Sequence, residues 1–374
     1  TVSITTKRTF SGEPLVIPRV VAVGPISFPF RGGRRVAPAA GPCSGYMPVA
    51  RVTPVMEQSR RSFLAFAGSI AIGSVAGCLG GGSDYENGWN RADSDTDDTL
   101  QDVAALENDA MAVGDDGTVI KRLSEGEWSA QNHAPGAADE TNVYAIAPTT
   151  NYDRAWFAGD NGLVGMYDSH GHFENHSNPL GRTKRFVDVA VDGAAGGEDI
   201  YLINDEGLII RGSKSQQGEV TWDLGKAPGE SEVLAVTFTT SNFGYACTNA
   251  GGAFQRAGQG WDRVGVPNVA EGLTDVAGHE ESLLDVASSK GRIHRYNGYD
   301  WRTIELGEEP IDAIHRTGRH GLAVSSDGVV YALNRSWDQS LDGLEEGLNG
   351  ATTGTEDSDV FCVGDNGFLI YRSK

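Results

Sequence analysis

Four aspartates share one local setting, in which an acidic residue begins a short apolar segment. They are Asp102, Asp188, Asp275 and Asp312. If a repeated fold brings these positions together around a common axis, their carboxylates form an electronegative ring, which could hold a cation or a basic peptide segment. The alternative, which we favour, is that each carboxylate accepts a backbone N–H from the neighbouring repeat. The ring is the best candidate for a binding site, and we assign no residue a catalytic role.

A histidine-rich stretch, HGHFENH at residues 170–176, is a second candidate. Alternate residues of a strand share a face, so His170, His172 and His176 could align with Glu174, and imidazole with carboxylate is a zinc-binding set. The alternative, which we favour, is a surface hairpin in which Phe173 is a buried plug. We therefore predict no bound metal.

Residues 93–98, DSDTDD, have the acidic spacing of a calcium loop. Asp98 stands where such a loop needs glycine, and Ala104 stands where it needs glutamate. We therefore interpret the stretch as a solvated acidic linker. A glycine-rich phosphate loop and an HExxH zinc motif are both absent from the sequence, and we predict no cofactor.

The location of the protein is predicted by residues 59–77. Ser59–Leu64, with Arg60 and Arg61 at its centre, resembles the twin-arginine export signal. Residues 62–77 carry no charge, but a membrane-spanning helix needs about 20 predominantly apolar residues. The alternative is a buried apolar helix that contains two arginines by chance.

Val75–Cys78 resembles the lipobox of lipoproteins, in which cleavage leaves a lipidated cysteine at the new N-terminus. Cys78 is then the lipid anchor, and residues 78–85, which include three consecutive glycines, are a flexible tether. These motifs place the protein at the outer face of the cytoplasmic membrane, lipid-anchored and extracellular.

Signal peptides are N-terminal, so we expect translation to start at Met56 and the signal peptide to span 56–77. Residues 1–55 would then be a mis-called upstream extension. Their proline-, glycine- and arginine-rich composition, with Glu13 as the one acidic residue, differs from the acidic remainder. The alternative is an authentic disordered basic extension.

The chain that remains after residue 77 is strongly acidic. The full chain carries a net charge of −21, which becomes −28 without residues 1–77, and six lysines remain. Such a surface is typical of proteins from salt-loving organisms, because molar salt reduces the Debye length to about 3 Å and screens carboxylate repulsion. The alternative is an ordinary acidic secreted protein. Either way, the charge argues against nucleic acid as a partner.

The elements that would position these side chains repeat along the chain. A turn that ends in glycine lies between two short apolar segments, as at 110–120, and the glycine supplies the positive φ of a tight hairpin. The seven turn glycines are Gly117, Gly162, Gly207, Gly251, Gly291, Gly328 and Gly367. Each turn has another apolar segment upstream. Six are followed by an aromatic residue: Trp128, Phe173, Trp222, Trp261, Trp301 and Trp337. Four strands in about 40 residues predict a blade of a β-propeller.

The seventh repeat lacks its outer segment, and the missing piece lies at the other end. Gly88–Arg91 matches the aromatic segments around Trp128 and Trp261. We therefore predict an all-β, seven-bladed propeller of four-stranded blades at 86–374, in which this N-terminal strand completes the last blade and removes a free edge. The alternative is an open β-solenoid.

The repeat of strand, G-D-x-G turn, strand and tryptophan resembles the BNR or Asp-box propellers, in style the photosystem-assembly-factor type. The resemblance covers residues 86–374 and implies a propeller. In this chain the family's "TTDGGKTW" half is replaced, for example by LSEGEW at 123–128. The family's partner is therefore not implied, because a fold does not determine function.

These observations predict a membrane-anchored, non-catalytic scaffold or assembly factor. It would be a monomer and would bind a membrane or surface protein. The alternative is an extracellular glycan-binding or glycan-hydrolysing propeller of the sialidase kind. The arginine triad, the Tyr–Glu pair and the Phe-Arg-Ile-Pro-like stretch of sialidases are not recognisable after residue 77.

Overall fold

The computed structural model describes residues 84–373 apart from 108, 125, 132, 133, 135, 138, 139, 229, 230, 241, 242, 259, 267, 268, 280–282, 356 and 357. The expected export signal with Arg60 and Arg61, the lipidation site Cys78 and the extension 1–55 lie outside these residues. No helix among the described residues is long and apolar enough to span a membrane.

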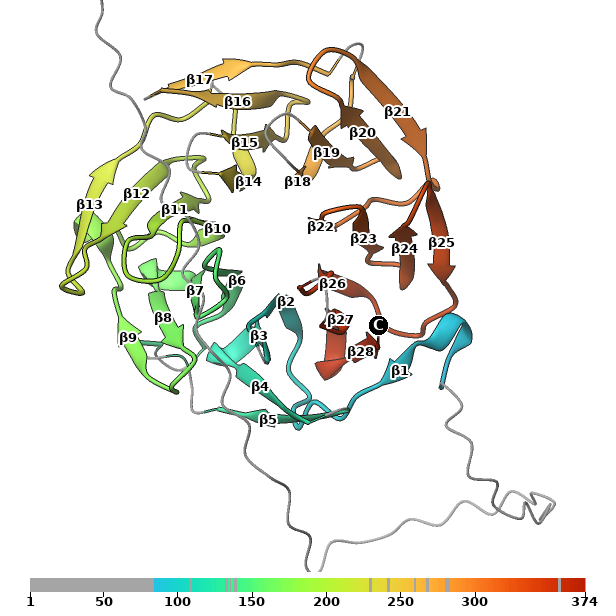
Figure 1. The fold of residues 1–374 in the computed structure, drawn as a ribbon, viewed down its shortest axis with the longest axis horizontal. Helices are drawn as coiled ribbons and strands as arrows, with labels where there is room; N and C mark the ends of the chain where they lie inside the picture. Colours follow the sequence, from blue (N-terminus) through green and yellow to red (C-terminus); the bar gives the residue numbers. More distant parts are fainter. Residues whose placement is uncertain are drawn as a thin grey trace, which may run out of the picture. The chain divides into compact units, whose positions relative to one another are not determined.

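Figure 1 shows a ring of four-stranded antiparallel sheets around a central axis, which confirms the predicted seven-bladed propeller. From the axis outward, blade 1 comprises β2 (Leu100–Ala105), β3 (Ala110–Gly114), β4 (Val119–Ser124) and β5 (Glu127–Ala130). Blade 2 comprises β6 (Val143–Pro148), β7 (Arg154–Gly159), β8 (Val164–Asp168) and β9 (Phe173–Asn175). Blade 3 comprises β10 (Phe186–Asp192), β11 (Asp199–Asn204), β12 (Ile209–Lys214) and β13 (Val220–Leu224).

The next three blades repeat this order. Blade 4 comprises β14 (Val233–Thr240), β15 (Phe243–Thr248), β16 (Ala253–Ala257) and β17 (Gly260–Arg263). Blade 5 comprises β18 (Leu273–His279), β19 (Leu283–Ser288), β20 (Arg292–Tyr296) and β21 (Trp301–Glu305). Blade 6 comprises β22 (Ala313–Thr317), β23 (His320–Ser325), β24 (Val329–Leu333) and β25 (Trp337–Leu341).

Blade 7 joins the two ends of the described chain. It comprises β26 (Leu348–Thr352), β27 (Val360–Gly364), β28 (Leu369–Arg372) and, outermost, β1 (Asn90–Arg91). Asn90 pairs with Tyr371 in antiparallel register. Trp89, fully buried, donates its indole N–H to the Ser340 hydroxyl of blade 6 (3.1 Å). The predicted ring closure is therefore confirmed.

The glycine turns lie between the second and third strand of each blade. All seven turn glycines have positive φ, from +66° to +75°. In three of the turns the residue before the glycine is also left-handed, as in Asp116 (φ +52°). This conformation matches the twist of a tight hairpin, so the predicted turns are confirmed.

The core lies between adjacent blades. Strands β3 and β27 are buried along their length, and the equivalent strands of the other blades are buried from their second residue onward. The predicted aromatic residues all lie in the fourth strands. Trp128, for example, packs edge-on against Phe361 of blade 7 with ring centroids 5.4 Å apart. Large outer aromatics fill the space that opens between wedge-shaped blades.

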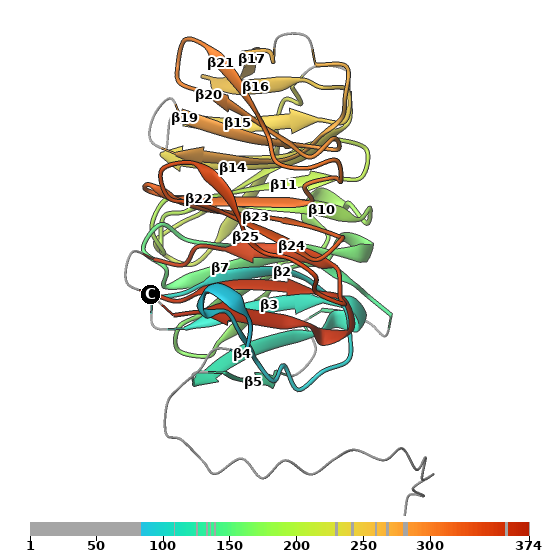
Figure 2. The same cartoon turned by 90° about the vertical axis from the view of Figure 1, so that its right-hand side faces the viewer.

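Strand direction defines two faces of the disc, seen edge-on in Figure 2. One face carries the glycine turns and the connections between blades, and we name it the turn face. The other carries the loops that join first to second and third to fourth strands, and we name it the mouth face. Because every blade is an antiparallel sheet with the same strand order, each face carries only its own two kinds of connection.

Candidate functional site

Three of the predicted aspartates clamp neighbouring blades together at the axis. Asp102 accepts the N–H of Val103 in its own strand (2.7 Å) and, with its other oxygen, the N–H of Ile146 in blade 2 (2.9 Å). Asp188 makes the same pair of contacts with Val189 (2.7 Å) and Val236 of blade 4 (2.7 Å). The favoured interpretation, a carboxylate that binds the neighbouring repeat, is confirmed at these positions.

The third clamp, Asp275, accepts the N–H of Val276 (2.6 Å) and that of Ile314 in blade 6 (2.7 Å). Blades 1, 3 and 5 thus each supply one carboxylate that binds two N–H groups. Blades 2, 4 and 6 have alanine at the equivalent position. These alanines are Ala145, Ala235 and Ala313.

An odd number of blades leaves the seventh without a partner, and Gly350 occupies the aspartate position there. A Cβ at residue 350 would lie 2.7 Å from the Asp102 Cα and 2.9 Å from the Gln101 carbonyl oxygen. Blade 7 approaches blade 1 too closely for any side chain at this level. The backbone contact replaces the carboxylate clamp where the ring closes.

The predicted four-membered ring was wrong in one member. Asp312 lies one residue before the equivalent position, which is Ala313. Its carboxylate instead accepts the N–H of Ser326 in the glycine turn of its own blade (2.6 Å). Asp312 shares the local setting of the other three aspartates, but the first strand of blade 6 begins one residue later, at Ala313.

Burial controls the protonation of the three clamps. It raises the pKa of Asp102 to about 7 and that of Asp275 to about 6, although the two N–H groups at each carboxylate act in the opposite direction. Burial, with the charges of Asp275 and Asp102, raises the pKa of Asp188 well above its usual range. Desolvation and like charge both favour the neutral acid.

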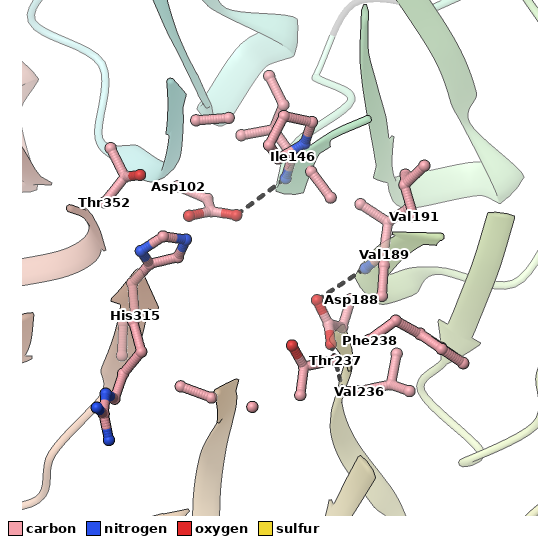
Figure 3. Close-up of a pocket in the computed structure, with 18 of the residues that line it drawn as sticks. Asp102, Ile146, Asp188, Val189, Val191, Val236, Thr237, Phe238, His315 and Thr352 are labelled. Carbon is pink, nitrogen blue, oxygen red and sulfur yellow. Dashed lines mark hydrogen bonds between the residues drawn. The ribbon is translucent and has the colours of Figure 1, made fainter. Parts of the chain in front are cut away.

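A cavity of about 290 Å³ occupies the channel from the level of the clamps to the mouth face. A single water needs only about 10–15 Å³ measured in this way. Figure 3 shows Asp102 and Asp188 at its wall, with Thr237, Phe238, His315 and Thr352 from other blades. The cavity combines a carboxylate base with walls of small apolar residues and threonines.

Tyr152 lies at the mouth of this cavity. Its backbone is left-handed (φ +59°), a conformation that non-glycine residues rarely adopt. Its carbonyl accepts the N–H of Glu107 in blade 1 (3.1 Å), and Thr317 of blade 6 lines the same cavity. Tyr152 thus connects the loops of blades 1 and 2 beside the channel.

His315, in β22, is held in one tautomer. Its Nδ1 accepts the N–H of Thr353 (3.1 Å). Because that nitrogen accepts a hydrogen bond, the neutral ring carries its proton on Nε2. Figure 3 shows the imidazole on the same side of the cavity as Asp102.

Arg316 is the cationic residue of the cavity wall, and Asp285 holds it in place. The fully buried carboxylate of Asp285 accepts from Arg316 Nη1 (2.6 Å) and from Nε and Nη2 of Arg295 (2.6 and 2.8 Å). Nη2 of Arg316 also donates to the Gly318 carbonyl (3.1 Å). Both guanidinium groups are therefore committed to one carboxylate.

The histidine-rich stretch does not bring its three imidazoles together. His170 and His172 lie in an exposed turn, where Asp168 Oδ2 contacts the Nδ1 of His172 (3.2 Å). His176 packs on Trp156 and contacts the Glu174 carboxylate (3.0 Å). Among the described residues no set of three His, Cys, Asp or Glu side chains could hold a metal ion. Phe173 is only half-buried, against Tyr167, so the predicted plug is partial.

Residues 93–98 connect β1 to β2 on the turn face. Asp93, Asp95 and Asp97 are exposed, whereas Asp98 accepts the Thr96 hydroxyl (3.1 Å). The stretch is therefore an acidic connection anchored through Asp98, in agreement with the predicted linker.

Sequence reasoning missed Tyr152, His315 and Arg316 because no motif marks them, the first in a loop and the other two inside β22. Asp285 did carry a signal. It is an acidic residue inside the apolar segment LLDVAS, and a charge in a buried strand needs a partner.

No family model matches the chain, and no curated protein matches it. Among solved structures, it is similar to "YCF48 bound to D1 peptide" (14% identity, TM-score 0.62, 78% of this chain and 96% of that chain). YCF48 from Cyanidioschyzon merolae gives a TM-score of 0.60 at 12% identity, covering 76% of this chain and 98% of that chain.

An enzyme shares the same fold. Virginiamycin B lyase from Staphylococcus aureus, in an inactive form with quinupristin, gives a TM-score of 0.62 at 11% identity and covers 76% of this chain and 99% of that chain. At these identities the similarity shows the fold alone.

Proposed function

We propose that the protein is a non-catalytic docking scaffold, or assembly factor, that binds a polypeptide segment at the mouth face. The observation that carries the proposal is the cavity of about 290 Å³ at the axis, which opens on that face of the propeller. The similar propeller YCF48 has been solved with a bound peptide, which supports a polypeptide ligand. The Asp-box-like repeat and the assembly-factor resemblance agree with this role.

We further propose that the protein is exported through its twin-arginine signal and anchored by a lipid on Cys78, as a monomer. The direction of β1 supports a particular placement of such an anchor. β28 runs toward the mouth face, so its antiparallel partner β1 starts there. Asp84 lies beside the start of β1, where its carboxylate accepts the N–H of Arg91 (3.1 Å).

The length of the tether then sets how the disc meets the membrane. Cys78 is six residues from Asp84, which span at most about 20 Å. An anchor at Cys78 would hold the mouth-face rim close to the lipid surface. A membrane protein or a surface protein near the bilayer is therefore the partner that the mouth face would meet first.

The test is site-specific photo-crosslinking in membranes of the source organism at native salt. A photoreactive residue replaces exposed Thr150 on the mouth face or, as the matched control, exposed Asn249 on the turn face. We expect a discrete adduct with one membrane or surface protein from position 150 and none from position 249. Equal adducts from both positions, or none with good recovery, would contradict the docking proposal and move attention to glycans.

The anchor has its own test. Cys78→Ala should release the folded protein from membranes into the soluble extracytoplasmic fraction, and Arg60→Lys with Arg61→Lys should retain it inside the cell. Membrane association that survives Cys78→Ala would exclude the lipid anchor without affecting the docking proposal.

A further inference from the structure

We infer that the channel cavity receives a cationic side chain, the ammonium of a lysine or the guanidinium of an arginine, carried by the bound polypeptide. This rests on the proposed function and specifies its ligand chemistry. The inference depends on the size of the cavity, its depth and the chemistry of its walls.

The cavity is deep enough for a side chain and part of the chain that bears it. Its wall in blade 6 runs from Ala313 to Thr317, which is five residues and four steps along a strand, or about 13 Å. That depth exceeds the length of a lysine side chain, which has a four-carbon stem. A ligand that reaches the clamps must therefore pass part of its backbone through the mouth.

The base of the cavity favours positive charge once its acids are ionised. Burial raises the pKa of all three acids in the empty cavity, so a cation that binds there displaces their protons. Asp102, Asp188 and Asp275 all line it. A carboxylate has about four lone-pair sites, and each clamp uses two of them on backbone N–H groups. Each therefore retains acceptor capacity for a donor that arrives from the cavity, and a fixed N–H framework keeps the three carboxylates in place.

The remaining charged groups of the wall do not cancel this preference. Arg316 is held by Asp285 together with Arg295, so that cluster keeps one excess positive charge at the wall of blade 6. His315 accepts a hydrogen bond at Nδ1 and is neutral in that state. An anion would approach Arg316 only by entering a cavity that three carboxylates line.

A bare metal ion fits the site less well than an organic cation. No three carboxylates or imidazoles among the described residues are close enough to coordinate one ion. An ammonium or guanidinium group, by contrast, spreads several N–H donors over a larger volume and can bind carboxylates that stand apart. Thr237 beside Asp188 and the other wall threonines offer further acceptors (Figure 3).

Tyr152 controls access in this arrangement. Its side chain and that of Thr317, from blades 2 and 6, both line the cavity near its mouth. A polypeptide that reaches the carboxylates must pass them. The phenol and the Phe238 ring then flank the stem of the incoming side chain, whose methylene groups pack well on aromatic surface.

The experiment compares two probes, acetyl-Gly-Lys-Gly-amide and its norleucine analogue, by NMR titration of alanine-methyl-labelled protein in fixed molar KCl. We expect the lysine probe to bind at least ten-fold more tightly than the norleucine probe. Asp188→Asn should weaken it at least ten-fold. Asp312→Asn removes the same charge outside the cavity and should change it less than two-fold. Equal binding of both probes, no binding of the lysine probe, or equal effects of the two substitutions would overturn the inference.

A second pair of variants tests the idea if Asp188→Asn fails to fold. Thr237→Lys places a tethered ammonium beside Asp188, and Thr237→Met places a neutral chain of similar size there. The lysine variant should have the higher melting temperature and should no longer bind the lysine probe. A methionine variant of equal or greater stability would contradict a cation site.

The outcomes separate this inference from the proposed function. Crosslinks from position 150 without lysine-probe binding would leave the docking scaffold in place and exclude the cationic ligand. Probe binding without crosslinks would leave a cation-binding cavity and exclude the protein partner.

Discussion

Asp102→Asn should remove part of the pH dependence of folding stability. Burial raises the pKa of Asp102 from 3.8 to about 7. Between these values the native carboxyl holds a proton that the unfolded chain has lost. Stability from this group is therefore fully present below about pH 4 and is lost as the pH rises toward 7. Asparagine does not titrate, so the substitution removes this component.

The magnitude follows from the shift. A proton bound only by the native state changes the free energy of unfolding by about 1.4 kcal/mol per pH unit. Between the unfolded and native pKa values of Asp102, the free energy of unfolding therefore changes by on the order of 4 kcal/mol. Asparagine also lowers stability at every pH. Its amide presents an N–H donor to one of the two backbone N–H groups, of Val103 or Ile146, and a buried donor without an acceptor costs about 1–3 kcal/mol. The deficit of the variant relative to the wild type should therefore be largest near pH 4.5 and should shrink or reverse by pH 7.5.

Urea unfolding of both proteins at half-unit steps from pH 4.5 to 7.5, in constant molar KCl, measures this difference directly. Asp116→Asn, an exposed carboxylate on the turn face, is the matched control and should show a constant difference from the wild type. If the difference for Asp102→Asn is also constant across the range, the N–H bonds outweigh burial and the reasoning about the clamp is wrong.

Three further results are expected. Gly350→Ala should lower unfolding free energy by about 1–3 kcal/mol in urea denaturation, because the new Cβ would meet the Asp102 Cα at 2.7 Å; an unchanged midpoint would show that blades 7 and 1 separate easily. Trp89→Ala should lower the free energy of unfolding by about 3–5 kcal/mol and expose the edge of β28. The same change at Trp261, a partly exposed outer aromatic, should lower it less. Equal decreases in melting temperature would argue that ring closure is not the stronger restraint. The melting temperature of the chain without residues 1–77 should rise with KCl because its charge is −28, and a salt-independent melting temperature would contradict the predicted halophilic surface.

Much of the fold could be predicted because its signals are local and repeated. The turn glycine with positive φ recurs seven times, and so do the apolar segments on its two sides. The downstream aromatic residue recurs six times, and each copy of the repeat supports the interpretation of the others. The ring closure was also predictable, since the segment around Trp89 matches what the last repeat lacks.

The site was predictable only in part. Asp102, Asp188 and Asp275 stand at one position of the repeat, so the sequence marks them. Asp312 shows the limit, because a shift of one residue moves a side chain from the axis to a glycine turn. Tyr152 and Thr317 are 165 positions apart, and only ring closure brings blade 2 opposite blade 6.

The repeat, the order of strands and the acidic composition follow from the sequence alone, because each depends only on residue types and on neighbours along the chain. The tertiary structure alone decided that three carboxylates bind six N–H groups in pairs and that glycine must close the odd seventh interface. It also decided that the cavity and the start of β1 share one face. These features depend on how many blades complete the circle, and that number follows from packing between wedge-shaped sheets.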